Sequence, residues 1–220
     1  MASSNEVTLS YWPIRGLAGV LRNVLAYCEV PFTNKLYTDA NEWFGKDKPE
    51  LGVDFPNLPY LKDGSKTITE TSSILQYIPI KAGKRELIGD TDEKFIQVQT
   101  ALGAVRDLWS GVSRLCWTKG DFEKEKTELF TNGAAKGHLT KFDTILKDRE
   151  WICGFLSVAD FALFEAVELT HDMDAKLLEP YTNLVTFKKR VEELPSIKAF
   201  RATPAFIKVW LPKSATWTNA

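Results

Sequence analysis

The segment from Asn57 to Leu75 reads Asn-Leu-Pro-Tyr-Leu-Lys-Asp-Gly-Ser-Lys-Thr-Ile-Thr-Glu-Thr-Ser-Ser-Ile-Leu, and it holds a prolyl turn, a hairpin and the start of a helix. Pro59 opens an apolar run typical of a strand, where a cis Leu58-Pro59 bond would turn the chain. We expect this turn to leave the backbone amide and carbonyl of Leu58 unpaired, so that a peptide-like ligand can bind them. The segment therefore predicts a ligand-binding site as well as local structure.

A hairpin and a helix follow the prolyl turn. Asp63-Gly64 is typical of a two-residue hairpin loop, here between Tyr60-Leu61 and Thr67-Ile68-Thr69. Glu70-Thr71-Ser72 then precede the apolar spacing of a helix. Because the first turn of a helix has free amides, its N-terminus is suited to binding a carboxylate.

The first part of the chain alternates between strand and helix patterns. Residues 7–11 alternate apolar and polar side chains, residues 17–28 have helical spacing, and residues 32–37 can return as a second strand. The irregular residues 38–55 then lead into the hairpin. The order β-α-β followed by β-β-α is that of a thioredoxin-like fold, so we predict a thioredoxin-like α/β domain over residues 1–83.

The rest of the chain has a helical pattern. The charged, glycine-containing residues 84–91 are predicted to link two domains. Asp90 and Glu93 are predicted to form a capping box. We predict an all-α domain over residues 92–220, whose first helix has a long apolar stripe formed by Phe95, Val98, Leu102, Val105, Trp109, Val112 and Cys116.

That first helix has a second face, on which small residues accompany one carboxylate, Asp107. This face suits close approach of a ligand or another helix, and crowding within one subunit explains it equally well. Further along, Ser157 and Asp160 precede a strongly apolar helix and are predicted to cap it, which is a folding role. Trp151 and Trp217 are predicted to be packing residues.

Composition argues against several classes of protein. A formal net charge of -1, with acidic and basic residues interspersed, does not fit a nucleic-acid binder. No apolar run approaches membrane-spanning length, and the polar residues 1–6 lack the pattern of an export signal. We therefore expect a cytoplasmic protein without membrane insertion.

The cysteines and histidines form no metal or catalytic pattern. Cys28, Cys116 and Cys153 are far apart and include no C-x-x-C pair, which predicts reduced, buried thiols. His138 and His171 have no second ligand at metal spacing, so neither a zinc site nor a histidine-based triad is expected.

A second informative segment, residues 9–17, reads Leu-Ser-Tyr-Trp-Pro-Ile-Arg-Gly-Leu and occupies the position of the reactive group in thioredoxin-like domains, yet it contains no cysteine. Together with residues 51–61, Leu-Gly-Val-Asp-Phe-Pro-Asn-Leu-Pro-Tyr-Leu, it resembles the cytosolic glutathione transferases, and the mu class most of all. The likeness covers almost the whole chain, including the tail that ends Ala215-Thr216-Trp217. It implies a homodimeric detoxification enzyme that conjugates glutathione, its cosubstrate, to apolar electrophiles without a metal or prosthetic group.

Such a reaction needs a thiolate, for which the resemblance implies Tyr11. A cysteine thiol has a pKa of about 8.5, so only a few per cent is ionised near neutral pH. A phenol that donates a hydrogen bond to sulfur favours the anion, and each pKa unit corresponds to about 1.4 kcal/mol. Without the surrounding motif, Tyr11 would be a tyrosine packed at the end of a strand.

The resemblance also assigns the γ-glutamyl end of glutathione. Thr71 gives its hydroxyl and amide to the carboxylate, and Glu70 accepts a hydrogen bond from the ammonium. Asp107 of the second subunit does the same, which implies a site shared across the dimer.

The implied contacts along the rest of the tripeptide are Trp12, Leu17, Trp43, Lys48, Asn57, Leu58 and Pro59. Leu58 pairs with the cysteinyl backbone, and Asn57 holds the turn. Lys48 meets the glycine carboxylate through charge, whereas outside the motif it would be an ordinary surface lysine.

A pocket for the electrophile is implied by Leu17, Trp109 and Trp117, with the C-terminal tail as a further candidate; Trp109 and the tail fit the core equally well. Phe55 is implied at the dimer interface, where burial in the partner would contribute up to about 3 kcal/mol per subunit. The alternative is that Phe55 folds back onto its own domain.

Four departures from the mu pattern have consequences. The chain between Tyr37 and Trp43 is too short for the mu loop and its glutathione-binding arginine, so weaker affinity is expected. Glu70-Thr71 replaces Gln-Ser, which should preserve binding. Trp117 replaces a tyrosine that faces the electrophile, so substrate preference does not carry over. Pro79 is expected to end or kink the helix that follows the hairpin.

Two rival functions share these residues. A glutathione-dependent isomerase, such as one acting on a prostaglandin endoperoxide, would need the same motifs but consume no net glutathione. A non-catalytic ligand carrier would keep the fold, although the presence of Tyr11, Thr71 and Lys48 argues against it.

Overall fold

The computed structural model describes residues 6–220, and its contacts divide the chain into two compact units. The first unit runs to Lys84 and includes Ser196–Val209; the second comprises Arg85–Pro195 and Trp210–Ala220. The predicted domain ranges place residues 196–209 in the helical domain, whereas these residues pack with the first unit. Residues 1–5, which contributed to the expected cytoplasmic location, lie outside the described part.

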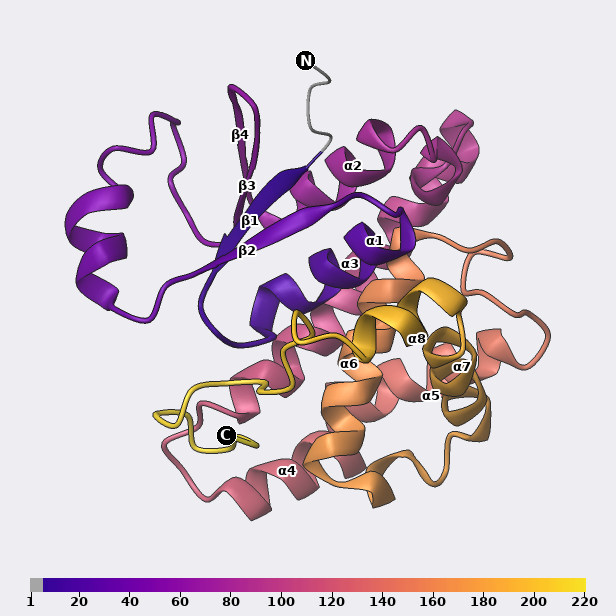
Figure 1. Ribbon diagram of the computed structural model, residues 1–220. Helices are drawn as coiled ribbons and strands as arrows, with labels where there is room; N and C mark the ends of the chain where they lie inside the picture. Colours follow the sequence, from indigo (N-terminus) through magenta and orange to yellow (C-terminus); the bar gives the residue numbers. More distant parts are fainter. Residues whose placement is uncertain (1–5) are drawn as a thin grey trace. The chain divides into compact units, whose positions relative to one another are not determined.

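A four-stranded sheet with the strand order β2-β1-β3-β4 forms the centre of the first unit (Figure 1). β1 (Val7–Tyr11) is parallel to β2 (Phe32–Leu36). β3 (Tyr60–Asp63) is antiparallel both to β1 and to β4 (Lys66–Thr69). The chain passes through these elements as β-α-β and then β-β-α, so the predicted thioredoxin-like fold is confirmed.

Two helices pack against each other in the same unit, α1 (Gly19–Tyr27) and α2 (Thr71–Lys81). A 3₁₀ turn, Gly16–Ala18, leads into α1. The centre of the unit is apolar because each fully buried aliphatic side chain contributes about 1.5–3 kcal/mol. Its fully buried side chains include Leu9, Leu21, Leu25, Leu61 and Ile74.

The segment Ser196–Val209 joins the first unit through aromatic contacts and one backbone bond. It includes most of α8 (Pro195–Arg201). The Phe200 ring lies 6.0 Å from the Phe32 ring of β2, and the Arg15 N–H donates to the Val209 carbonyl at 2.7 Å. Helical spacing alone contains no information about these partners, so the predicted ranges missed them.

The predicted hairpin is present, but its loop is displaced by one residue. Asp63 pairs with Lys66, so Gly64 and Ser65 form the turn instead of Asp63 and Gly64. Gly64 has a φ of 57°, a left-handed conformation that glycine adopts at low cost.

The segment expected to be irregular, residues 38–55, contains a π-helical turn, Glu42–Asp47, named here the π turn. Its defining bond runs from the Lys48 N–H to the Trp43 carbonyl, five residues earlier, at 2.8 Å. A π-helical turn has no apolar periodicity of its own, and the sequence therefore did not reveal it.

Pro79 does not end α2 early, since the helix continues to Lys81. The side chain of Asp63 on β3 holds this last turn: Lys81 Nζ lies 2.9 Å from its carboxylate, and the Tyr77 hydroxyl donates to it at 2.5 Å. These tertiary bonds offset the backbone hydrogen bond that proline cannot donate.

The second unit is built from five helices among the described residues: α3 (Asp92–Leu115), α4 (Phe122–Thr131), α5 (Ala134–Leu146), α6 (Val158–Met173) and α7 (Thr182–Glu192). α3 packs against α4, α5 and α6, while α7 packs against α5 and α6. The predicted linker holds a 3₁₀ turn, Arg85–Ile88, with Leu87 and Ile88 buried. A second 3₁₀ turn, Ala175–Leu178, follows α6.

Helix α3 differs from its prediction at its start. Thr91 caps the helix by accepting from the Lys94 N–H at 3.3 Å, whereas Asp90 pairs with the Lys94 ammonium, so the predicted Asp90–Glu93 capping box is wrong. Phe95 is 40% exposed, although Val98 and others of its stripe are buried. A threonine one residue later satisfies the same amides, which is why the spacing misled.

The predicted cap of α6 is confirmed. Asp160 is fully buried and accepts from the Ser157 N–H, the Ser157 hydroxyl and the Ile152 N–H, each at 2.9 Å. Burial nevertheless raises the pKa of Asp160 to about 6. Trp151 packs edge-on against Phe187.

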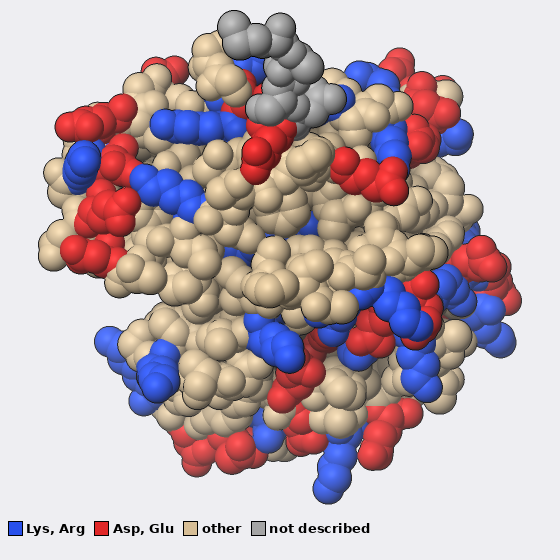
Figure 2. All heavy atoms as spheres, viewed as in Figure 1, with Lys and Arg blue, Asp and Glu red and all other residues tan. Residues whose placement is uncertain are grey.

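The cysteines and the surface also bear on the sequence predictions. Cys28, Cys116 and Cys153 are free and buried, as predicted. On the face shown in Figure 2, basic and acidic side chains are intermixed. Within residues 6–220, no helix combines the length and the apolar character needed to cross a membrane.

Candidate active site

Tyr11 ends β1 and begins the loop that leads to α1. Its side chain is 7% exposed, and its hydroxyl oxygen accepts a hydrogen bond from the Leu17 N–H at 3.2 Å. Arg22 on α1 fixes this loop by donating to the Ile14 carbonyl and to Asn34 Oδ1, both at 2.9 Å. The Leu17 bond uses a lone pair of the phenol, so the O–H proton of Tyr11 is left for another acceptor.

Gly16 permits this close arrangement. It has a φ of 39°, and a Cβ at this position would lie 2.8 Å from the Tyr11 hydroxyl oxygen. Any side chain would therefore displace the phenol. Gly16 belongs to the motif of residues 9–17, but a lone glycine before a helix is too weak a signal to predict this role.

The protonation of Tyr11 decides what its hydroxyl can do. Burial raises the pKa of Tyr11, although the Leu17 amide and the Arg22 charge act in the opposite direction. An ordinary tyrosine already has a pKa of about 10, so this phenol is neutral at physiological pH. It can donate a hydrogen bond to an anion but is not suited to act as a base.

The prolyl turn agrees with the sequence prediction in one respect and differs in another. The Leu58-Pro59 bond is cis, as predicted. The Leu58 amide is not unpaired, because Asn57 Oδ1 accepts from it at 2.9 Å. Within residues 6–220, the Leu58 carbonyl has no hydrogen-bond partner. To pair with Leu58, a peptide ligand would have to displace the Asn57 side chain from the Leu58 amide, whereas the Leu58 carbonyl is already available to it.

The N-terminus of α2 has no side-chain cap. Glu70, at the capping position, has a φ of 67° and a ψ of 124°, and its carboxylate accepts from Asn57 Nδ2 at 3.1 Å. Thr71 is half-buried, and its hydroxyl has no partner among the described residues. The positive φ of Glu70 costs about 1–3 kcal/mol in a residue other than glycine, and strained conformations of this kind cluster at functional sites. The first-turn amides are thus open to an anion.

Trp43 and Lys48 lie at the two ends of the π-turn bond. Trp43 is 2% exposed, with its ring centroid 5.9 Å from that of Tyr60 and 5.4 Å from that of Tyr37. Lys48 is half-buried, its ammonium lies 5.8 Å from the Phe44 ring, and it has no ion pair within residues 6–220. Its charge is therefore free for a ligand, whereas most of the Trp43 surface is used in packing.

Three further predicted residues of the first unit differ in exposure. Trp12 is half-buried, with its ring 6.1 Å from that of Tyr37. Leu17 is 42% exposed, and Phe55 is 75% exposed. Phe55 therefore does not fold back onto its own unit, and that alternative is wrong.

The remaining predicted residues belong to the second unit. Asp107 and Trp109 lie on α3, and Trp117 follows it. Asp107 is exposed and forms no ion pair with the described residues, while Trp117 is 46% exposed. Trp109 is half-buried, and its ring lies 6.3 Å from that of Trp210.

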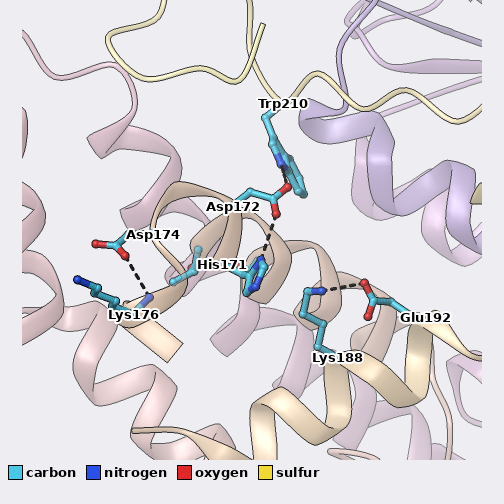
Figure 3. A network of polar contacts seen from close by, with 9 residues as sticks. His171, Asp172, Asp174, Lys176, Lys188, Glu192 and Trp210 are labelled. Atoms are coloured by element: carbon cyan, nitrogen blue, oxygen red, sulfur yellow. Dashed lines mark hydrogen bonds and ion pairs between the residues drawn. The ribbon is translucent and has the colours of Figure 1, made fainter. Parts of the chain in front are cut away.

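The C-terminal tail packs within the second unit, and its contacts were not predicted. The N–H groups of Thr216 and Trp217 donate to the Cys116 carbonyl at 2.9 and 3.2 Å, next to Trp117. Figure 3 shows the indole of Trp210 directed at Asp172, to which it donates at 2.7 Å. The other carboxylate oxygen of Asp172 lies 3.2 Å from His171 Nδ1 (Figure 3). Neither Trp210 nor Asp172 belongs to a sequence motif, so this hydrogen bond could not be predicted from the sequence.

Comparison with known proteins identifies the family. The family described as "Glutathione S-transferase, N-terminal domain" matches residues 7–79, and "Glutathione S-transferase, C-terminal domain" matches residues 106–204. Glutathione S-transferase Mu 4 of Mus musculus is 36% identical over 97% of this chain and 99% of its own length.

Solved structures agree with this result. A Pi-class glutathione S-transferase of Onchocerca volvulus is 28% identical, with a TM-score of 0.75, over 88% of this chain and 91% of that one. Rat hPGDS, complexed with a quinoline, is 25% identical, with a TM-score of 0.75, over 89% of this chain and 95% of that one.

A thioredoxin-like unit followed by a helical unit is the architecture of the glutathione transferases. The chain belongs to the glutathione S-transferase family. It is a transferase with glutathione as cosubstrate, and the resemblance to the mu class is confirmed. Within residues 6–220, no group of three His, Cys, Asp or Glu side chains is arranged to hold a metal ion.

Proposed function

We propose that this enzyme transfers the sulfur of glutathione to apolar electrophiles, with Tyr11 hydrogen-bonded to the thiolate. The observation that carries this proposal is the state of the Tyr11 hydroxyl, which accepts from the Leu17 N–H and keeps its own proton because burial raises its pKa. One hydrogen bond to a charged group contributes about 1.5–3 kcal/mol, which equals a fall of about one to two units in the pKa of the thiol.

The γ-glutamyl end of glutathione would bind at the N-terminus of α2. The open amides and the Thr71 hydroxyl are suited to its carboxylate, and the Glu70 carboxylate is suited to its ammonium. Both groups of the ligand would then meet opposite charge or partial charge within one helical turn. This arrangement also accounts for an N-terminus without a side-chain cap.

The rest of the tripeptide would follow the prolyl turn to the π turn. The cysteinyl backbone pairs with Leu58, once Asn57 releases the amide, and the glycine carboxylate meets the unpaired ammonium of Lys48. Trp12, Leu17, Trp43 and Pro59 complete the proposed contacts. Weaker affinity than in enzymes with the mu loop stays a prediction.

We further propose a homodimer. The Phe55 ring, 75% exposed, would be buried in the partner, and the exposed Asp107 would reach the partner's γ-glutamyl site. Leu17, Trp109 and Trp117 are proposed to line the electrophile pocket, with the C-terminal tail beside Trp117. The cytoplasmic location also stays a prediction.

The test is the ultraviolet difference spectrum of the glutathione complex across pH, which reports thiolate directly. Tyr11→Phe should keep glutathione affinity nearly unchanged, raise the pKa of the bound thiol, and lower turnover near neutral pH by about tenfold or more, because one thiolate donor is lost. Tyr77→Phe is the matched control: it removes a tyrosine hydroxyl of the same unit, bonded to Asp63, and should leave the thiol pKa as in wild type. Equal turnover in Tyr11→Phe would exclude Tyr11 from the mechanism.

The rival functions predict other results. An isomerase would convert its substrate without net consumption of glutathione, which product analysis detects. If glutathione binds but its thiol pKa is not lowered in the wild type, the ligand-carrier alternative is favoured.

A further inference from the structure

The π turn is held by a polar network that no local sequence pattern indicates. Asp47, its last residue, accepts a hydrogen bond from the Tyr37 hydroxyl at 2.6 Å and forms an ion pair with Lys35 on β2. Lys35 also lies 3.4 Å from the carboxylate of Glu42, the first residue of the turn. Both ends of the π turn are therefore tied to the end of the same strand.

The network continues to the prolyl turn. The hydroxyls of Tyr37 and Tyr60 are 2.8 Å apart, and Tyr60 directly follows Pro59. The Trp43 ring stacks on the Tyr60 ring at an interplanar angle of 24°. One connected group of side chains thus joins β2, the π turn and the start of β3.

Charge and burial strengthen the bonds of this network. Tyr37 is 1% exposed, and because its hydroxyl donates to Asp47, it accepts from the Tyr60 hydroxyl. The hydrogen bond from Lys35, and then that from Tyr37, hold the pKa of Asp47 below its ordinary value, so the carboxylate stays charged at neutral pH. Charge-assisted hydrogen bonds of this kind are about twice as strong as neutral ones.

We propose that Asp47 is a positioning residue for the glycine end of glutathione: by anchoring the π turn to Tyr37 and Lys35, it fixes the place of Lys48. Lys48 is the next residue along the chain, and its N–H closes the π-turn bond to the Trp43 carbonyl. Asp47 does not touch the ligand itself.

This inference rests on the proposed contact between Lys48 and the glycine carboxylate. It is tested with two ligands, glutathione and γ-glutamylcysteine, which lacks the glycine. Dissociation constants for both are measured in the wild type and in the variants Asp47→Ala, Asp47→Asn and Asp63→Ala. The ratio of the two constants isolates the contribution of the glycine end.

Asp63→Ala is a closely matched control. Asp63 belongs to the same unit and, like Asp47, pairs with one lysine and one tyrosine, Lys81 and Tyr77. The side chains of Asp47 and Asp63 are both 19% exposed. A loss of general stability in the first unit should therefore appear in both alanine variants.

In Asp47→Ala we expect the preference for glutathione over γ-glutamylcysteine to fall about tenfold. The fall should come from weaker binding of glutathione alone. The kcat at saturating glutathione should be unchanged. Asp47→Asn keeps an acceptor for Tyr37 and should lose less. Asp63→Ala should keep the wild-type preference. Tyr37→Phe retains the ring but not the hydroxyl, and it should act in the same direction as Asp47→Ala.

Two results would overturn the inference. If Asp47→Ala weakens both ligands equally, or neither, Asp47 has only a structural role. If the wild type itself does not prefer glutathione, the Lys48 contact in the proposed function is wrong and the anchor has no ligand to position. The wild-type ratio therefore separates failure of the proposed contact from failure of the Asp47 role.

Discussion

The N-termini of α2 and α6 differ sharply, although both helices begin after polar residues. At α6, Asp160 is fully buried and accepts three hydrogen bonds from Ser157 and Ile152. At α2, no side chain caps the helix, and Glu70 has a φ of 67°.

The difference shows that the amides at a helix N-terminus can serve either folding or ligand binding. Free amides at a helix N-terminus need an acceptor, which either the chain or a ligand supplies. At α6 the chain supplies it through a buried capping box, in which the Ser157 side chain accepts from the Asp160 N–H and the Asp160 carboxylate accepts from the Ser157 N–H. The α2 terminus keeps its donors open at half-exposed Thr71, and it does so at a cost in backbone strain.

The comparison predicts its largest effect at α6. Asp160→Ala should lower the free energy of unfolding by roughly 2–5 kcal/mol, because two buried backbone N–H groups lose their acceptor. Asp121→Ala removes an exposed cap of α4, bonded to the Lys124 N–H, and should cost only about 1 kcal/mol. Denaturant unfolding of both variants measures the difference, and equal losses would contradict the contrast.

A second effect separates affinity from stability. Thr71→Ala at α2 should weaken glutathione binding about tenfold, since one hydroxyl donor to a carboxylate is lost, and should leave the unfolding midpoint unchanged. Thr91→Ala removes the cap of α3 and should do the opposite, costing about 1 kcal/mol of stability without affecting affinity. Calorimetric titration and thermal unfolding of the pair provide the measurement. A loss of stability in Thr71→Ala would mean that α2 depends on this threonine as a cap.

The smallest effect concerns the strained residue itself. Glu70→Gly should raise stability by up to about 1 kcal/mol, because glycine adopts a positive φ without strain, and should weaken glutathione binding. Glu70→Gln keeps the backbone strain and removes only the charge, so it should weaken binding with no change in stability. If Glu70→Gly binds glutathione as tightly as the wild type, Glu70 is not an acceptor for the ammonium.

The sequence predicted most of the fold, and its proposed site residues stay predictions. The β-α-β and β-β-α order, the cis Leu58-Pro59 bond and the Ser157–Asp160 cap all follow from local patterns and are present. It missed the π turn, the cap at Thr91 and the bond between Asn57 and the Leu58 amide. Each of these features depends on which of several neighbouring groups forms a hydrogen bond, and local propensity favours the alternatives almost equally.

By itself, the sequence determined the family, the two kinds of secondary structure and the presence of a phenol at the end of the first strand, because periodicity and short motifs are local properties of the chain. Only the tertiary structure decided that Gly16 must lack a side chain beside Tyr11, and that Asp47, Tyr37 and Lys35 anchor the π turn. These contacts join residues on different elements. The energies of these contacts depend on distances and burial in three dimensions, which cannot be read from local sequence patterns.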